Sequence, residues 1–432
     1  MTTDPGVTTQ WTRTRSTDTA TVDVTRLFAE HFGGEPAVVH SAPGRANVIG
    51  EHVDYAAGIC LPFALEQRTF IAARLNDLGT YRLVSRMQDS AGQESVTTAE
   101  VPTGEVGPGS PADWSGYVVG TIWAAMDNGT IPPLPAGTGL DLAIESDVPL
   151  GAGLSSSAAL ECAAGLAAWT LLTTQTAQIT QPTLTDAIRE GLMHAAIRAE
   201  NDVVGASTGG LDQRASLFAT RAHALAIDFG RDEHYQVPFD LESHNLAILV
   251  TNTNAPHTLA DGQYASRRAV IDGMTAFVQQ RLGYASLRDA DEAGQEMAVL
   301  CARWASENNQ DAHVVTDRVA HVTGEIRRTA QAIEFLQAGD MAALGSAMTA
   351  SHASLRDLYQ VSCPELDLAV DVALATGALG SRMIGGGFGG SAIALVPVKT
   401  TDATASAIAS AFSDAGFRAP EFLVARAGDG AV

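Results

Sequence analysis

Four residues with chemically useful side chains stand close together near the N-terminus. Arg45, Glu51, His52 and Asp54 supply one cation, two carboxylates and one imidazole within ten residues. Carboxylates accept hydrogen bonds and imidazole can donate or accept one, so these groups suit a ligand with several hydroxyls, such as a sugar. The apolar residues 48 and 49 predict a short strand that enters a turn here. The alternative is an exposed polar turn, because most such turns are solvated.

A run rich in glycine and serine precedes a stretch of helix-forming residues. The run consists of Gly151, Ala152, Gly153, Leu154, Ser155, Ser156 and Ser157. Residues 158–170 are rich in alanine and leucine and lack proline, which predicts that the serines form the first turn of a helix. Backbone N–H groups and the positive end of the helix dipole can hold phosphate there, and a serine hydroxyl can reach Mg²⁺. An ordinary serine-capped helix is the alternative.

Cationic side chains for a phosphate site are scarce in this chain. The G-x-x-x-x-G-K-[ST] pattern is absent, and Lys399 is the only lysine in the sequence. A phosphate site would therefore depend on backbone N–H groups, Mg²⁺ and arginine. Arg45 is the candidate for that arginine.

Two further segments could contribute to a site. Asp212 follows two glycines and precedes a possible helix, so it is either a helix cap or a functional acid. Residues 385–390 contain five glycines and join two strand-like segments, 382–384 and 391–396. Such a turn could press against a ligand or a neighbouring loop, although a plain hairpin turn is the alternative.

Taken in order, these motifs resemble those of the GHMP small-molecule kinases, and among them the galactokinases. The resemblance is carried by residues 44–55, 149–159 and 382–390, and residues 51–55 point to the galactokinase branch. It extends over roughly residues 28–397. It implies an α+β fold of two domains with the active site between them, and ATP and Mg²⁺ as cofactors.

The same resemblance implies a role for each candidate residue. Asp212 would take the proton from the anomeric hydroxyl of the sugar or orient that hydroxyl, and Arg45 would keep Asp212 ionised and offset charge on the transferring phosphoryl group. The sugar hydroxyls would be bound by Glu51, His52, Asp54 and Tyr264. Residues 151–157 would wrap the ATP phosphates, Ser85 would contact the nucleotide, and Ser157 and Glu200 would hold Mg²⁺.

The implied reaction is the ATP-dependent phosphorylation of D-galactose at the anomeric hydroxyl, giving galactose 1-phosphate and ADP. Two alternatives stay open: a kinase for a related sugar such as N-acetylgalactosamine or galacturonate, and a galactose sensor without catalysis. The complete serine run and the presence of Asp212 favour catalysis. Two departures from the family pattern are Gly210, two residues before the acid, and Ile384, ahead of the glycine run.

Composition limits the possible partners. The 432 residues carry a formal net charge of -23, which argues against nucleic acid and anionic membranes as partners because both are polyanions. The sequence lacks a run of about 20 apolar residues and a signal-peptide core. Its four cysteines are widely spaced, which indicates neither a disulfide framework nor a zinc site. We expect a cytoplasmic monomer that binds galactose and ATP.

The elements that must position these residues can be predicted coarsely. Residues 1–22 are rich in threonine and aspartate and are expected to form a flexible tail. The N-terminal domain, with the sugar and ATP motifs, should cover residues 23–240, and the C-terminal domain residues 241–432. Apolar spacing predicts helices over 114–126, 265–282 and 320–336, and a strand over 246–250.

Overall fold

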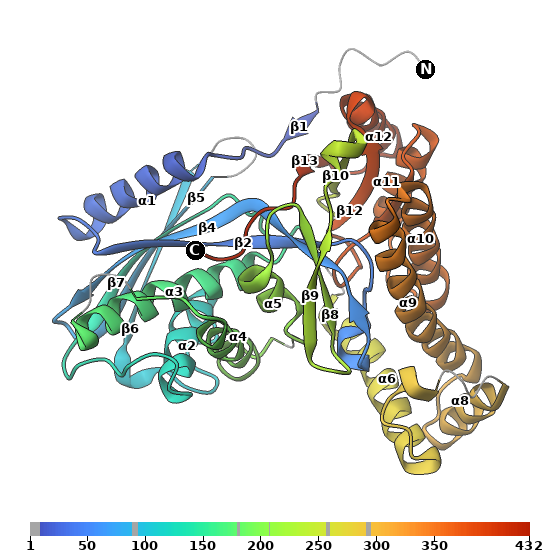
Figure 1. The fold of residues 1–432 in the computed structure, drawn as a ribbon, viewed down its shortest axis with the longest axis horizontal. Helices are drawn as coiled ribbons and strands as arrows, with labels where there is room; N and C mark the ends of the chain where they lie inside the picture. The colour runs from blue at the N-terminus through green and yellow to red at the C-terminus, as the bar shows by residue number, and fades with distance from the viewer. Residues whose placement is uncertain (1–8, 89–93, 179–181, 207, 256–259, 291–294) are drawn as a thin grey trace.

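The computed structural model describes residues 9–88, 94–178, 182–206, 208–255, 260–290 and 295–432 (Figure 1). The described chain forms two five-stranded sheets and one three-stranded sheet, with helices packed around them. Among the described helices, none combines the length and the apolar character that a bilayer span needs.

The N-terminal sheet has the strand order β2-β4-β7-β5-β6. Its strands are β2 (Val38–Asn47), β4 (Pro62–Asn76), β7 (Gly139–Ser146), β5 (Thr80–Gln88) and β6 (Glu94–Pro102). Neighbours run antiparallel except β5 and β7, which are parallel. Strand β4 is buried along most of its length, because helices cover both faces of the sheet.

Helix α1 (Thr17–Phe32) covers one face of this sheet, and α2, α3 and α4 cover the other (Figure 1). The last three span Trp114–Asp127, Ser156–Ala177 and Asp186–Arg198. The buried residues of α1 are Ala20, Val24, Leu27 and Phe28, at the spacing of one helical face. They pack against apolar residues of β4, β5 and β7, which fixes α1 on the sheet.

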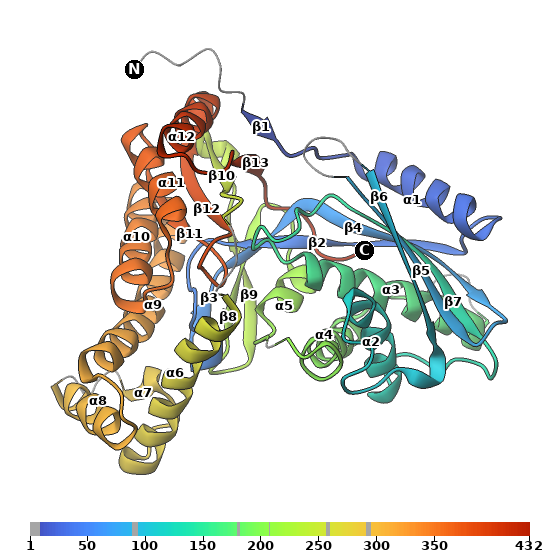
Figure 2. The same ribbon diagram turned by 180° about the vertical axis from the view of Figure 1, so that it is seen from behind.

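The C-terminal sheet has the order β1-β13-β10-β12-β11. Its strands are β1 (Gln10–Trp11), β13 (Glu421–Ala425), β10 (Leu246–Asn252), β12 (Ser391–Pro397) and β11 (Gly380–Met383). Helices α9 to α12 lie along it, and α6 to α8 pack at the end of the C-terminal half (Figure 2). These helices are α6 (Ala260–Leu282), α7 (Leu287–Ala290), α8 (Gln295–Glu307), α9 (Ala312–Ala338), α10 (Met341–Ser354), α11 (Pro364–Ala375) and α12 (Thr401–Ala415).

A small sheet of β3 (Ile59–Cys60), β8 (His223–Asp228) and β9 (Glu233–Pro238) lies between the two larger sheets (Figure 1). Ala224, Ala226 and Val237 of this sheet share one hydrophobic cluster with residues of β4, β10 and β12, so the core continues from one half into the other. The link between β9 and β10 is short and polar, and we propose that the domain boundary lies there, near residue 240.

The predicted elements agree with the structure where apolar spacing carried the prediction. The predicted strand over 246–250 lies within β10, and the helices predicted over 114–126, 265–282 and 320–336 lie within α2, α6 and α9. The four cysteines are free thiols, as the spacing indicated.

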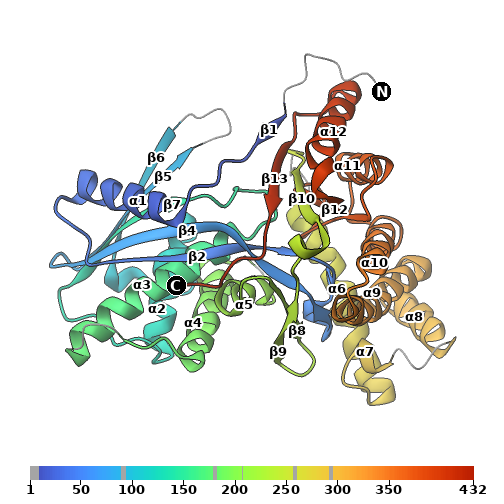
Figure 3. The ribbon, with the colours of Figure 1, turned by 45° about the horizontal axis from the view of Figure 1, so that its top comes forward.

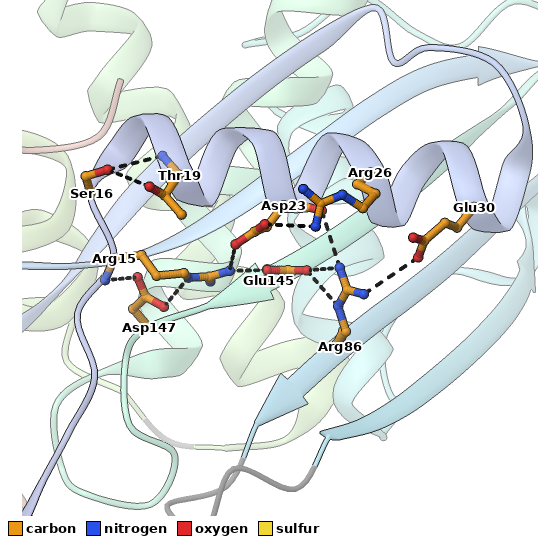
Figure 4. Close-up of polar contacts among 9 residues, drawn as sticks. All are labelled: Arg15, Ser16, Thr19, Asp23, Arg26, Glu30, Arg86, Glu145 and Asp147. Carbon is orange, nitrogen blue, oxygen red and sulfur yellow. Dashed lines mark hydrogen bonds and ion pairs between the residues drawn. The ribbon is translucent and has the colours of Figure 1, made fainter.

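The prediction of a flexible tail over residues 1–22 is wrong for residues 10–22. Strand β1 pairs in parallel with β13, and α1 begins at Thr17 behind a Ser16 cap (Figure 3). The prediction rested on the threonine- and aspartate-rich composition of this segment. The segment is nevertheless ordered, because partners that lie far away in the sequence hold it in place. The backbone N–H and Nε of Arg15 donate to Asp147 at 3.2 and 2.8 Å, and its Nη1 donates to Asp23 at 3.1 Å and to Glu145 (Figure 4).

We expect Arg15→Met to lower the free energy of unfolding by about 3 kcal/mol, because Glu145 and Asp147 would stay buried beside one cation fewer. The control is Arg26→Met, since the Arg26 side chain is 57% exposed and pairs with Asp23 from the surface of α1. That variant should lose no more than about 0.5 kcal/mol. Urea unfolding of both proteins tests this, and equal losses would contradict the expectation.

The segment after β13 returns to the N-terminal half. The N–H groups of Gly428, Ala431 and Val432 donate to the carbonyls of Ala64, Ser216 and Ser41 at 2.8, 2.8 and 2.9 Å. The buried Arg68 side chain donates to the carbonyls of residues 429 and 430 at 2.7 and 2.9 Å. Residues 428–432 therefore fasten the C-terminal sheet to the strand and helix that carry Arg45 and Asp212.

Candidate active site

A buried arginine and an acid form the centre of the site. Arg45 lies on β2, and Asp212 lies in the first turn of α5 (Leu211–Phe218). The Nε and Nη2 atoms of Arg45 lie 2.8 and 2.7 Å from Oδ1 of Asp212, and its Nη1 donates to the Gly153 carbonyl at 2.6 Å. Arg45 is only 7% exposed, so its charge acts with little screening by water. The structure thus brings together the two residues predicted for catalysis.

Gly44 allows β2 to pass directly against the glycine- and serine-rich loop. A Cβ atom at this position would lie 2.5 Å from the Leu154 carbonyl oxygen and 2.8 Å from Cγ1 of Val148. The neighbouring Arg45 N–H donates to the same carbonyl at 3.0 Å. Only glycine permits such a close approach of two backbones, and it sets the distance from Arg45 to the loop.

The serine run lies at the start of α3, as predicted. Ser155 precedes the helix in a left-handed conformation with φ of 59°, and Ser156 is the first helical residue. The Ser155 hydroxyl donates to Oδ2 of Asp212 at 2.5 Å. Asp212 is therefore held through one oxygen by Arg45 and through the other by Ser155. This second contact fixes the direction of the carboxylate.

Next to this pair lies a group of buried acids and amides. The hydroxyl of Ser157 donates to Oε1 of Glu200 at 3.5 Å, and Gln213 Nε2 donates to Glu200 Oε2 at 2.7 Å and to Glu161 Oε2 at 2.9 Å. Burial, together with the charge of Asp212, raises the pKa of Glu200 to about 7. Burial and the charge of Glu200 raise the pKa of Glu161 well above its usual range.

The described residues contain no cluster of three or more acidic, histidine or cysteine side chains arranged for a metal, so this group offers a divalent cation few protein ligands, of which Ser157 and Glu200 are the candidates. A hydroxyl oxygen and carboxylate oxygens are the donors that Mg²⁺ prefers in proteins. Among the described residues, Oε1 of Glu161 has no hydrogen-bond partner, and the pKa of Glu200 is raised first by burial and then by the charge of Asp212. Glu161 was missed by the sequence analysis, because a glutamate inside a helix carries no local sign of its surroundings.

The turn that follows β2 carries the residues predicted for a sugar. Glu51 accepts a hydrogen bond from the Gly385 N–H at 2.9 Å through Oε1, which also lies 3.6 Å from Nη1 of Arg382. His52 has φ of 60° and shares a hydrogen bond of 3.1 Å with the Tyr55 hydroxyl. Burial, and to a smaller extent the charge of His321, lowers the pKa of His52 to about 3, so the imidazole is neutral at pH 7.

Asp54 and the segment before Asp212 are in close contact. A Cβ atom on Gly209 would lie 2.1 Å from Oδ2 of Asp54, so a larger residue at that position would displace the Asp54 carboxylate. Burial, together with the charges of Asp212 and Glu51, raises the pKa of Asp54 to about 6. Asp54, one of the residues predicted for the sugar, thus lies beside the segment that carries Asp212.

A residue of the C-terminal half contacts the turn that follows β2, which we call the sugar turn (residues 50–55). Glu325, which is fully buried on α9, accepts hydrogen bonds from the Gly50 N–H at 3.0 Å and from the Ser351 hydroxyl at 2.5 Å. Burial alone would raise the pKa of Glu325, but the charges of Arg382, His321 and Arg328 outweigh it and lower the pKa to about 2. Glu325 is a second residue that the sequence analysis missed.

The glycine-rich turn 385–390 connects β11 to β12 and touches both loops of the site. Gly385 donates to Glu51, and the Ser391 hydroxyl at the end of the turn donates to the Ala152 carbonyl at 2.6 Å. The prediction that this turn presses against a neighbouring loop is confirmed. Arg382, just before the turn, is fully buried and donates to the carbonyls of Asn47 and Val48 at 3.2 and 3.3 Å.

Two predicted residues are not joined to this centre by the contacts above. Ser85 lies on β5, where its register partners are Thr97 on β6 and Ile144 on β7. Tyr264 lies on α6, but its side chain is outside the described part of the structure.

Three parts of the chain match known sequence families. Residues 26–75 match the galactokinase galactose-binding signature, residues 116–220 the GHMP kinases N terminal domain, and residues 332–418 the GHMP kinases C terminal domain. The galactokinase of Streptomyces coelicolor is 39% identical over 408 residues, which cover 92% of this chain and 94% of that protein. The galactokinase of Homo sapiens is 40% identical over 380 residues, 86% of either chain.

Solved structures show the same relationship. The structure of Lactococcus lactis galactokinase complexed with galactose superimposes with a TM-score of 0.80 and 30% identity, covering 95% of this chain and 99% of the other. A mevalonate kinase structure shares the fold, with a TM-score of 0.56 and 15% identity over 90% of this chain and 99% of its own.

Proposed function

This chain belongs to the galactokinases of the GHMP kinase family, and from that premise we propose that Asp212 receives the proton of the anomeric hydroxyl of galactose. The chain is an enzyme that phosphorylates galactose with ATP. The observation that carries the proposed mechanism is the contact of Asp212 with both Arg45 and Ser155, which holds the acid between the sugar turn and the phosphate loop.

In the proposed reaction, the anomeric oxygen forms a bond to the γ-phosphorus while the bond from that phosphorus to the leaving oxygen of ADP breaks. The proton of the hydroxyl passes to Asp212. Arg45 offsets charge on the transferring group, and because it also contacts Gly153 it ties the position of the acid to that of the phosphate loop. An ionised aspartate is a weak base, so its orienting of the hydroxyl contributes beside the proton transfer.

For the nucleotide, we propose that the N–H groups of residues 151–157 and the positive end of α3 hold the phosphates. Ser157 and Glu200 would hold Mg²⁺, which when bound neutralises charge on the phosphates. Contact of Ser85 with the nucleotide, binding of sugar by Tyr264, a monomeric state and a cytoplasmic location stay predictions.

For the sugar, we propose that Glu51, His52 and Asp54 bind hydroxyls of galactose. Glu51 and Asp54 can accept hydrogen bonds, and the neutral His52 can accept or donate one. Contacts from Gly385 to Glu51 and from Glu325 to Gly50 support the turn that carries these groups.

We expect galactose to bind about tenfold more weakly at pH 5 than at pH 7, because a pKa of about 6 leaves only a small ionised fraction of Asp54 at pH 5. The sign follows from the ligand: a carboxylate accepts hydrogen bonds from hydroxyls more strongly than the protonated acid does. Calorimetric titration with galactose, without ATP, measures the affinity between pH 4.5 and 8. Asp54→Asn should bind more weakly and lose this pH dependence, and an unchanged affinity down to pH 5 would refute the assignment.

The test of the function is ATP turnover by purified protein with galactose, N-acetylgalactosamine, galacturonate, glucose and arabinose. Selective turnover of galactose is expected. Faster turnover of another of these sugars would show that the chain is a kinase with that sugar as its substrate. Binding of galactose without turnover would make the chain a sensor.

A further inference from the structure

Glu161 is a buried acid that the mechanism above does not use. It lies on α3, one turn after Ser157, and is fully buried. Its Oε2 accepts one hydrogen bond, from Gln213, and its Oε1 has no hydrogen-bond partner among the described residues. Burying a carboxyl group with so few partners costs stability, so its presence calls for a reason outside folding.

The hydrogen bonds of Gln213 point to that reason. Gln213 is fully buried and follows Asp212 directly. Its amide nitrogen has two hydrogens, and the nitrogen lies 2.9 Å from Glu161 Oε2 and 2.7 Å from Glu200 Oε2. Both donors are therefore used, and the plane of the amide is fixed by the two acids. The other oxygen of Glu200 faces the Ser157 hydroxyl at 3.5 Å.

We propose that Glu161 is a positioning residue for the metal site, which holds Gln213 and thereby directs Glu200 toward Ser157. The inference rests on the proposed function, in which Ser157 and Glu200 hold Mg²⁺. Glu161 itself touches neither of these residues in the contacts described. Without the Glu161 oxygen, the Gln213 amide keeps only its hydrogen bond to Glu200, so its plane and the direction of Glu200 are held less firmly.

The test compares variants at position 161 in the full-length protein. Glu161→Met removes the acceptor at similar length, and Glu161→Gln keeps an acceptor oxygen. Binding of Mn²⁺ in the presence of ADP, followed by electron paramagnetic resonance, should weaken about 10- to 100-fold in Glu161→Met, as is usual when a partner of a metal ligand is lost. Glu161→Gln should restore most of the affinity, and galactose affinity should be unchanged in both.

Two further variants make the result specific. Gln213→Met should weaken Mn²⁺ binding as Glu161→Met does, and the double variant should be no worse than either, because both break the same link. Thr170→Val, on the same helix but away from the site, is the control and should bind Mn²⁺ normally. Gln213→Met and Glu161→Gln test the same hydrogen bond between Gln213 and Glu161. They therefore decide whether Glu161 has a positioning role if Glu161→Met does not fold.

The failures can be told apart with Glu200→Gln. If Glu200→Gln leaves Mn²⁺ binding unchanged, the proposed metal site itself is wrong. If Glu200→Gln weakens Mn²⁺ binding while Glu161→Met and Gln213→Met do not, the metal site stands and the positioning role of Glu161 is overturned. Loss of galactose affinity equal to the loss of Mn²⁺ affinity would also overturn it, because it would indicate a general disturbance of the fold.

Discussion

Asp212→Asn is expected to lower kcat by about 10²- to 10⁴-fold, the usual contribution of a positioned base. An asparagine cannot take up the proton of the attacking hydroxyl. It also removes the negative charge that holds the Nε and Nη2 atoms of Arg45, which lie 2.8 and 2.7 Å from Oδ1. Steady-state kinetics with saturating ATP and galactose measure the loss, and circular dichroism shows whether the variant is folded.

The matched control is Asp232→Asn. Asp232 pairs with Arg214, which lies on α5 as Asp212 does. The Asp232 side chain is 76% exposed and lies outside the site. This variant should keep kcat within about twofold, as surface substitutions usually do. Full turnover by Asp212→Asn would show that Asp212 is not the base.

Arg45→Met is expected to lower kcat by about 10²- to 10³-fold, the effect of removing one group that stabilises transition-state charge. The buried guanidinium contacts both Asp212 and the Gly153 carbonyl, so its loss removes a charge and a positional link together. Arg45→Lys should recover part of the rate, because lysine keeps the charge but cannot make the forked contact. The measurement is kcat and KM for both substrates.

Arg214→Met provides the comparison for Arg45→Met. Both arginines are 7% exposed and pair with an aspartate, but Arg214 points to Asp232 and not to the site. It should lose stability without a comparable loss of kcat. If both variants lost kcat equally, the effect of Arg45 would be one of packing and not of charge.

The centre of the site could be predicted from sequence because its residues stand in short contiguous motifs. The serine run combines residue type with a position at a helix start that suits phosphate, whereas the roles of Arg45 and Asp212 were implied by the family resemblance. The residues that hold these motifs in place could not be predicted in the same way. Glu325 and Gly50 are 275 positions apart, and nothing near Glu325 in the sequence indicates that its oxygen will meet a backbone N–H of the sugar turn.

The structure shows the surroundings of Gly210 and Ile384, the two residues that depart from the family pattern. Gly210 precedes α5 in a left-handed conformation with φ of 90°, which glycine adopts without strain. Ile384 is buried, and its N–H donates to the Ser391 carbonyl at 2.9 Å, so the position serves to close the glycine turn.

Strands and helices with clear apolar spacing were predictable because their burial leaves a local pattern. The order of segment 10–22 was not predictable, since β1 forms only by pairing with β13, about four hundred residues later in the chain.

The return of residues 428–432 to the N-terminal half has a consequence for movement between the two halves. N–H groups of this segment donate to the carbonyls of Ser41, Ala64 and Ser216, while β13, which precedes the segment, belongs to the C-terminal sheet. Because Ser216 lies on α5, the C-terminal sheet cannot shift relative to the helix that carries Asp212 without breaking one of these hydrogen bonds or bending residues 426–427.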